Sequence, residues 1–179
     1  MTTPQRHMGV DGMFIFADAG VVPQPTAEQL ADIAISTADS ARLYFEVEPR
    51  IAMLSFSTKG SATHPDVDKV IEATRLAQSR RPDLLIEGEL QGDAAIIPEV
   101  AAQKCPGDKL QGTANVLIFP DLDAGNIAYK LVQRLTGGEA YGPLVQGLAK
   151  PGLDLSRGST ADEIVNVIAI AALRAGAGI

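Results

Sequence analysis

The sequence predicts an α/β protein built on a mainly parallel sheet. Short apolar runs alternate along the chain with longer segments of helical periodicity, which is the pattern of repeated strand–helix–strand units. The apolar runs do not alternate with polar residues, as expected for strands that are covered on both faces. Together these observations predict a three-layer sandwich, with the sheet between two layers of helices.

The first half of the chain is predicted to supply three strands and two helices. The apolar run 13–17 indicates a buried strand after an irregular polar segment over residues 1–12. Thr26-Ala27-Glu28-Gln29 is a capping box, and the helix that it starts is expected to run to about Leu43. A strand over 51–55, a helix over 65–80 and a strand over 84–87 follow.

The next elements continue this alternation. We expect a helical segment over 93–104, interrupted near Pro98, and a fourth strand over 115–119. The following helix, over 124–135, should stop at Gly137-Gly138, because glycine readily takes the left-handed conformation that ends helices. Leu144 and Val145 predict a short fifth strand.

The last helix should begin near residue 161. Ser159 or Thr160 can serve as its N-cap, with Asp162 or Glu163 three residues further on as in a capping box. Residues 167–173 are all apolar, so this helix is expected to be covered by protein on every side. The apolar run is too short for a membrane span, which needs about 20 residues.

Composition limits the classes of partner and compartment. A length of 179 residues predicts about one domain, and a net charge of −7 argues against nucleic acid or an anionic membrane as partner. The single cysteine, Cys105, excludes an internal disulfide and, with no signal-peptide pattern at the N-terminus, favours the cytoplasm. His7 and His64 have no partner at ligand spacing, so no metal site is expected.

Polar side chains follow each predicted strand, at positions that share one edge of an open parallel sheet, where ligands usually bind. Lys59 could contact a phosphate of a bound ligand or could be a solvated loop lysine. Asn126 and Lys130 face the same way on a helix, so that one ligand could touch both, although capping and surface roles explain them equally well. The full set is Asp18, Ser55, Ser57, Thr58, Lys59, Glu89, Asp93, Asp121, Asp123, Asn126 and Gln146.

The stretch 154–163 has the clearest chemical pattern. Ser156, Arg157 and Gly158 stand just before the start of the last helix. A helix N-terminus offers free N–H groups and partial positive charge, so a neighbouring arginine makes a seat for phosphate or another small anion. A capped helix whose arginine points into solvent is the alternative, and on the residues alone it is the more common outcome.

Seven blocks of this sequence together resemble the phosphate acetyltransferase (phosphotransacetylase) family. They occur in order from about Met13 to the end of the chain, without large gaps. The blocks are 16–18 (FAD), 25–34 (PTAEQLADIA), 48–55 (EPRIAMLS), 57–61 (STKGS), 114–122 (ANVLIFPDL), 125–130 (GNIAYK) and 154–158 (DLSRG).

The resemblance implies an isocitrate-dehydrogenase-like sandwich in which the first of two lobes is largely absent. Residues 13–143 would form the second α/β lobe, and 144–179 the segment that returns to the first lobe with the active-site loop and helix. The family transfers an acetyl group between CoA and orthophosphate, with CoA as a substrate and without a metal or prosthetic group.

The resemblance also implies roles for individual residues. Ser156 and Arg157 fall on the active-site serine and arginine, which would stabilise the reacting centre and hold the phosphate or acyl oxygen. The proposed general base, an aspartate in the family, falls on Glu163, whereas the neighbouring Asp162 should point roughly 100° away around the helix. Ser159 stands where relatives often have cysteine, next to the substrates.

Two alternatives to a complete acetyltransferase stay open at this point. The chain could be a non-catalytic module that binds acetyl-CoA or acetyl phosphate, or an enzyme similar to phosphate butyryltransferase. Because a first lobe is missing, we also expect a homo-oligomer, such as a homodimer, or contact with another polypeptide through the apolar last helix.

Overall fold

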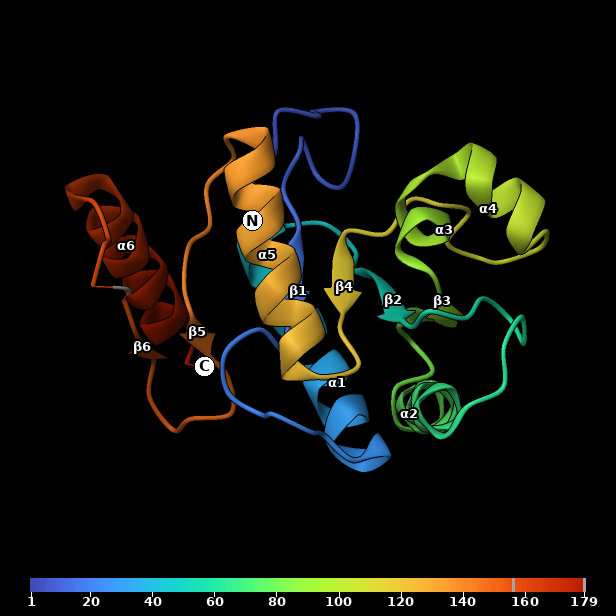
Figure 1. Cartoon of the computed structure of the whole chain (residues 1–179). Coiled ribbons are helices and arrows are strands. Elements are labelled where there is room, and N and C mark those ends of the chain that lie inside the picture. The colour runs from blue at the N-terminus through green and yellow to red at the C-terminus, as the bar shows by residue number, and fades with distance from the viewer. Residues whose placement is uncertain (156, 179) are drawn as a thin grey trace.

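The sheet at the centre of the protein is parallel throughout. The computed structural model describes residues 1–155 and 157–178 (Figure 1). Its main sheet has four strands in the order β1-β4-β2-β3, and every pairing is parallel, which confirms the predicted sheet. The strands are β1 (Ile15–Ala17), β2 (Arg50–Leu54), β3 (Leu85–Leu90) and β4 (Val116–Ile118).

Helices cover both faces of this sheet, so the three-layer prediction is also confirmed. Ile51 and Met53 of β2 point into a core shared with α1 (Ala27–Phe45) and α2 (Pro65–Arg80). Ala52 and Leu54 of the same strand point to the opposite face, because successive side chains alternate along a strand. That face carries α3 (Gly92–Ile96), α4 (Pro98–Lys104) and α5 (Leu122–Thr136).

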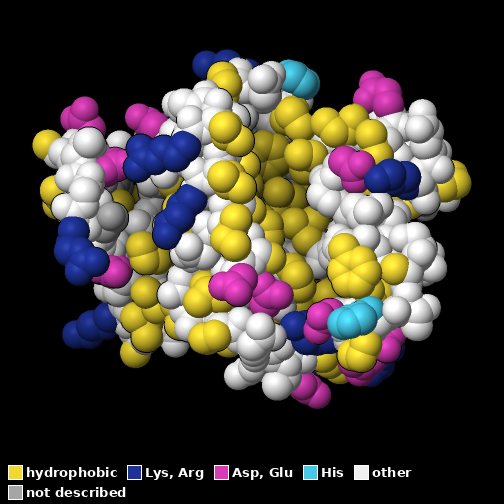
Figure 2. Space-filling model, in the orientation of Figure 1, with side chains coloured by type: hydrophobic (Ala, Val, Ile, Leu, Met, Phe, Trp, Pro, Cys, Tyr) yellow, Lys and Arg dark blue, Asp and Glu magenta, His cyan; other side chains and the backbone are white. Residues whose placement is uncertain are grey.

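The second face is covered less completely than the first. Figure 2 shows a hollow lined with hydrophobic side chains between α5 and the α3–α4 pair. Helix α5 also presents Ile127, Leu131 and Leu135 to solvent, with 56%, 54% and 81% of their surfaces exposed. Residues four apart lie on one side of a helix, so these three form a continuous apolar stripe.

Local capping chemistry sets the helix ends where the sequence predicts them. Thr26 Oγ1 accepts from the Gln29 N–H (3.3 Å) and Gln29 Oε1 accepts from the Thr26 N–H (2.9 Å), which completes the capping box of α1. Helix α2 spans Pro65–Arg80 as predicted. Helix α5 ends at Gly137, whose φ of 69° is left-handed.

The predicted fifth strand exists, but it does not extend the parallel sheet. β5 (Leu144–Val145) pairs antiparallel with β6 (Gly152–Leu153), which the sequence did not reveal. A short connection suits a hairpin, whereas a parallel pairing needs a crossover of a dozen residues or more. Gln146 therefore leaves the strand-exit edge, where we had expected it, and its Oε1 accepts from Thr37 Oγ1 on α1 (3.2 Å).

The last helix, α6 (Ala161–Ala177), lies at the periphery rather than between layers of protein. The sequence prediction of cover on every side is wrong within this chain, since only Val167 and Arg174 of the helix are buried. The apolar sequence of this helix predicts that other side chains bury its surface, but it does not reveal whether they belong to this chain or to another. Four large apolar side chains stay 38–63% exposed: Ile164, Val165, Ile168 and Leu173. No helix among the described residues is long and apolar enough to cross a membrane.

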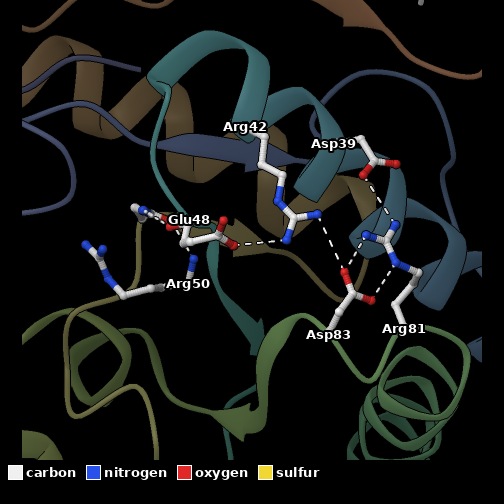
Figure 3. Close-up of polar contacts among 7 residues, drawn as sticks. Asp39, Arg42, Glu48, Arg50, Arg81 and Asp83 are labelled. Atoms are coloured by element: carbon white, nitrogen blue, oxygen red, sulfur yellow. Dashed lines mark hydrogen bonds and ion pairs between the residues drawn. The ribbon is translucent and has the colours of Figure 1, made fainter.

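A network of ion pairs joins the ends of α1 and α2 to the segments before β2 and β3 (Figure 3). Arg42 contacts Glu48 (2.9 Å) and Asp83 (3.6 Å). Arg81 contacts Asp83 (2.8 Å) and Asp39 (3.3 Å). The hydrogen bonds from Arg81 are the main reason that the pKa of Asp83 is lowered to about 2.

We expect that in Asp83→Asn the free energy of unfolding falls less steeply as the pH is lowered into the acid range. The Asp83 carboxyl has a lower pKa in the folded state than its ordinary 3.8, so the unfolded chain binds the proton more readily between these values. The stabilisation is present above about pH 4 and is lost as the pH falls through about 2. Urea unfolding at several pH values from 7 to 2 measures it. Asp11→Asn, at an exposed loop aspartate, should keep the wild-type profile.

Candidate active site

The polar residues that follow the strands mostly hold their own loops. Asp18 accepts hydrogen bonds from the backbone N–H groups of Gly20, Val21 and Val22, at 2.8, 3.1 and 2.6 Å. Asn126 Nδ2 donates to the carbonyl oxygen of Ala19 at 3.1 Å. Asn126, which we predicted to bind a ligand, thus connects the beginning of α5 to the loop after β1.

Lys59 lies among carboxylates rather than open to a ligand. Its Nζ donates to Glu87 Oε2 (2.7 Å) and to the carbonyl oxygen of Gly88 (3.0 Å), and it lies 3.9 Å from Asp108 Oδ1. Burial, and next the charge of Glu87, raise the pKa of Asp108. The lysine therefore neutralises a buried acidic pair, Glu87 and Asp108, and its predicted contact with substrate stays a prediction.

Lys130 is exposed one turn after Asn126 on α5. Its Nζ lies 5.7 Å from the centre of the Tyr129 ring, within the range of a weak cation–π contact. Asn126 and Lys130 are four positions apart on α5, but the Asn126 amide nitrogen is engaged by Ala19, whereas Lys130 is exposed.

The strand-exit edge and the start of α6 lie apart in the fold (Figure 1). In Figure 1 the β4 arrow points down, so the carboxyl ends of the parallel strands face the lower part of the molecule. Helix α6 ends near the label C and begins at the upper left, on the far side of α5 from the loop that carries Lys59. The path after α5 accounts for this separation: the chain runs down beside α5 to the β5–β6 hairpin, and α6 lies on the other side of that descending segment (Figure 1).

The loop before α6 is bounded by this hairpin. Asp154 N donates to the carbonyl oxygen of Pro143 (3.2 Å), which extends the pairing of β5 with β6, and Asp154 Oδ1 accepts from the Leu155 N–H (2.8 Å). Ser156, the predicted active-site serine, lies outside the described residues. Arg157 is exposed in a turn, and Ser159 is half-buried.

The start of α6 resolves the two choices that the sequence left open. Thr160 is the N-cap: its Oγ1 accepts from the Glu163 N–H at 3.2 Å. Glu163 Oε2 accepts from the Thr160 N–H at 2.7 Å. The half-buried Glu163 is therefore the acid tied to the loop, whereas Asp162 is exposed.

Sequence reasoning missed Tyr141, whose phenol lies close to this loop. Its hydroxyl donates to the Glu139 carboxylate; this bond, followed by burial and by the charges of Glu139, Glu163 and Asp162, raises the pKa of Tyr141 to about 12. Tyr141 is therefore a neutral hydroxyl at neutral pH. No motif marks it, because its acidic neighbours on α6 are some twenty positions away along the chain.

The oxyanion site that the sequence predicts before α6 stays a prediction, which two features support. Arg157 is the only cationic residue between positions 154 and 163, and it stands immediately before a helix N-terminus. Both features favour a phosphoryl or acyl oxygen. Among residues 1–155 and 157–178, no three His, Cys, Asp or Glu side chains come together in a way that could hold a metal ion.

The chain is similar to known proteins over almost its whole length. A family model described as "Phosphate acetyl/butaryl transferase" matches residues 1–172. The chain is 55% identical over 175 residues to a phosphate acetyltransferase of Acetivibrio thermocellus, covering 98% of this chain and 53% of the relative. It is also 55% identical over 179 residues to that of Clostridium acetobutylicum, covering 100% of this chain and 54% of the relative.

Solved structures show the same similarity. A phosphotransacetylase from Streptococcus pyogenes superposes with a TM-score of 0.87 at 52% identity, covering 92% of this chain and 50% of that one. The EutD phosphotransacetylase from Staphylococcus aureus gives a TM-score of 0.86 at 50% identity, covering 90% of this chain and 50% of that one. The chain thus spans about half the length of these relatives.

Proposed function

This chain belongs to the phosphate acetyl/butaryl transferase family, and on that premise we propose that it takes part in moving an acetyl group between CoA and orthophosphate. The observation that carries the proposal is its 55% identity, over nearly its whole length, to proteins named phosphate acetyltransferase. Because it spans about half of those proteins, the reaction is assigned to this chain either alone or with a complementary lobe.

In the proposed reaction, a phosphate oxygen attacks the carbonyl carbon of acetyl-CoA. A C–O bond forms, the carbonyl becomes a tetrahedral oxyanion, and the C–S bond then breaks to release CoA thiolate, which takes up a proton. Arg157 would hold the phosphate, because a planar guanidinium matches two phosphate oxygens at once. The Ser156 hydroxyl and the N–H groups at the start of α6 would stabilise the oxyanion.

Glu163 is the proposed acid–base group. In the direction of acetyl-CoA synthesis the CoA thiol must lose a proton before its sulfur attacks acetyl phosphate, and a carboxylate can accept that proton. The bond from the Thr160 N–H fixes Glu163 Oε2 beside the loop and leaves Oε1 for this task. Ser159 lies in the same loop. Contacts of Lys59, Asn126 and Lys130 with the substrates stay predictions.

A further protein surface should cover α6. It exposes several large apolar side chains, as does the apolar stripe of α5, and large exposed apolar patches mark interaction surfaces. We propose that a first lobe or another copy of the chain, as in a homodimer, supplies this cover. The lone buried Cys105 and the acidic composition are consistent with a cytoplasmic enzyme acting on small molecules, without nucleic acid as partner.

Incubation of the purified chain with acetyl-CoA and orthophosphate tests the proposal. We expect acetyl phosphate and free thiol to appear together in equal amounts, since one C–S bond breaks for each C–O bond formed. A parallel assay with butyryl-CoA examines the acyl group, which should be used less well if the named relatives are a guide.

The chain spans about half the length of its relatives, and a module that binds substrates without turnover is the alternative proposal. A module that only binds acetyl-CoA or acetyl phosphate would show affinity in a calorimetric titration without forming product. Absence of both binding and turnover would contradict the transferase and the binding module alike.

A further inference from the structure

Arg174, in the last turn of α6, is a buried cation without a carboxylate partner among residues 1–155 and 157–178. Only 3% of its surface is exposed, and no ion pair reaches it from the residues that the structure describes. Its Nε is also buried without a hydrogen-bond partner among them. A buried charge that is not paired is costly, and an apolar side chain of similar volume often serves stability better. Stability alone therefore does not account for an arginine here.

A hydrogen bond from this guanidinium to the backbone points to another role. Arg174 Nη1 donates to the carbonyl oxygen of Val145 at 2.7 Å. Val145 belongs to β5, and its partner strand β6 ends four residues before Arg157. The same hairpin is held from α1 through the bond between Thr37 and Gln146. Arg174 thus connects the far end of α6 to the hairpin that leads into the loop.

Few other contacts fix α6. Val167 is the other buried residue of the helix, and the side chains around it are largely exposed. A rigid helix held at two points has a defined direction, whereas a helix held at one point can pivot. The start of α6 carries Glu163, and the loop before it carries Arg157, so a pivot would separate the two groups.

We propose that Arg174 is a positioning residue, which locks α6 against the β5–β6 hairpin so that Arg157 and Glu163 keep a fixed relation. The significance of this relation for acetyl transfer rests on the proposed function. The lock itself is a property of the folded chain and can be measured without substrate.

Hydrogen exchange tests the lock on both sides of the loop. The Asp154 N–H bonds to Pro143, and the Ile164 N–H bonds to Thr160, so both amides report local opening. In Arg174→Met we expect both to exchange about tenfold faster, the factor for loss of one hydrogen bond from a charged donor. The melting temperature should stay equal to wild type or rise, because the buried charge is gone. Arg174→Lys should restore part of the protection.

Arg134→Met is the matched control, since Arg134 is an exposed arginine in the last turn of α5. It should change neither the amide exchange rates nor the melting temperature.

Unchanged amide exchange in Arg174→Met would overturn the proposal. So would a large fall in melting temperature with faster exchange throughout the sheet, because Arg174 would then be a stability residue only. If the wild type also forms acetyl phosphate, kcat should fall more than KM rises in Arg174→Met. A chain that shows neither turnover nor substrate binding would contradict the proposed function and leave the exchange result intact.

Discussion

Replacing Arg157 with alanine is expected to weaken phosphate binding by about a hundredfold, the upper range for hydrogen bonds from a charged donor. Arg157 is the only cation of the loop 154–163, so no neighbour there can substitute for it. The change should appear in KM for phosphate, with little effect on KM for CoA. A ³¹P NMR titration with inorganic phosphate measures the same loss where turnover is too slow to follow.

Two further variants make this result specific. Arg157→Lys keeps the charge but loses the bidentate geometry, and should fall between wild type and alanine. Arg134→Ala removes an exposed arginine of α5 and makes the net charge more negative by the same amount, without touching the loop. Equal phosphate affinity in wild type and Arg157→Ala would remove Arg157 from the site.

Gly125→Ala should cost about 3 kcal/mol or more of folding free energy, the high end for forced overpacking. A Cβ at Gly125 would lie 2.1 Å from the carbonyl oxygen of Asp18 and 3.3 Å from Cα of Ala19. The opposing backbone cannot easily retreat, because Asp18 accepts three backbone hydrogen bonds and Asn126 holds Ala19. Thermal unfolding should show a midpoint lower by roughly 10 °C.

Gly176→Ala supplies the comparison for that substitution. Gly176 lies in α6, and a Cβ there meets nothing within 4 Å. Alanine is the better helix former, so this variant should be as stable as wild type or more stable by up to about 1 kcal/mol. If Gly125→Ala melted like Gly176→Ala, the close approach of α5 to the loop after β1 would be wrong.

Features encoded by neighbouring residues were predictable from the sequence. The capping boxes at Thr26 and Thr160 bring together residues three apart, so the starts of α1 and α6 follow from local chemistry. The four parallel strands follow from buried apolar runs between helices. These signals need no knowledge of the tertiary structure.

Features that depend on the path of the chain were not predictable in this way. The strands β5 and β6 are two residues each, too short for any periodic pattern, so the hairpin and the displaced Gln146 were missed. The pairing of Lys59 with Glu87 joins positions 28 apart, and the nearness of Tyr141 to α6 also depends on the fold. The resemblance of the block 154–158 could identify the loop but not where the fold would place it.

The strand order also constrains how the sheet can assemble. β1 forms its ladder with β4 alone, and β4 fills the gap between β1 and β2. Contacts between distant positions slow folding, and β1 can pair with β4 only after about a hundred further residues have been synthesised. During synthesis on the ribosome, the opening strand should stay unpaired, and open to chaperones, until residue 118 has emerged.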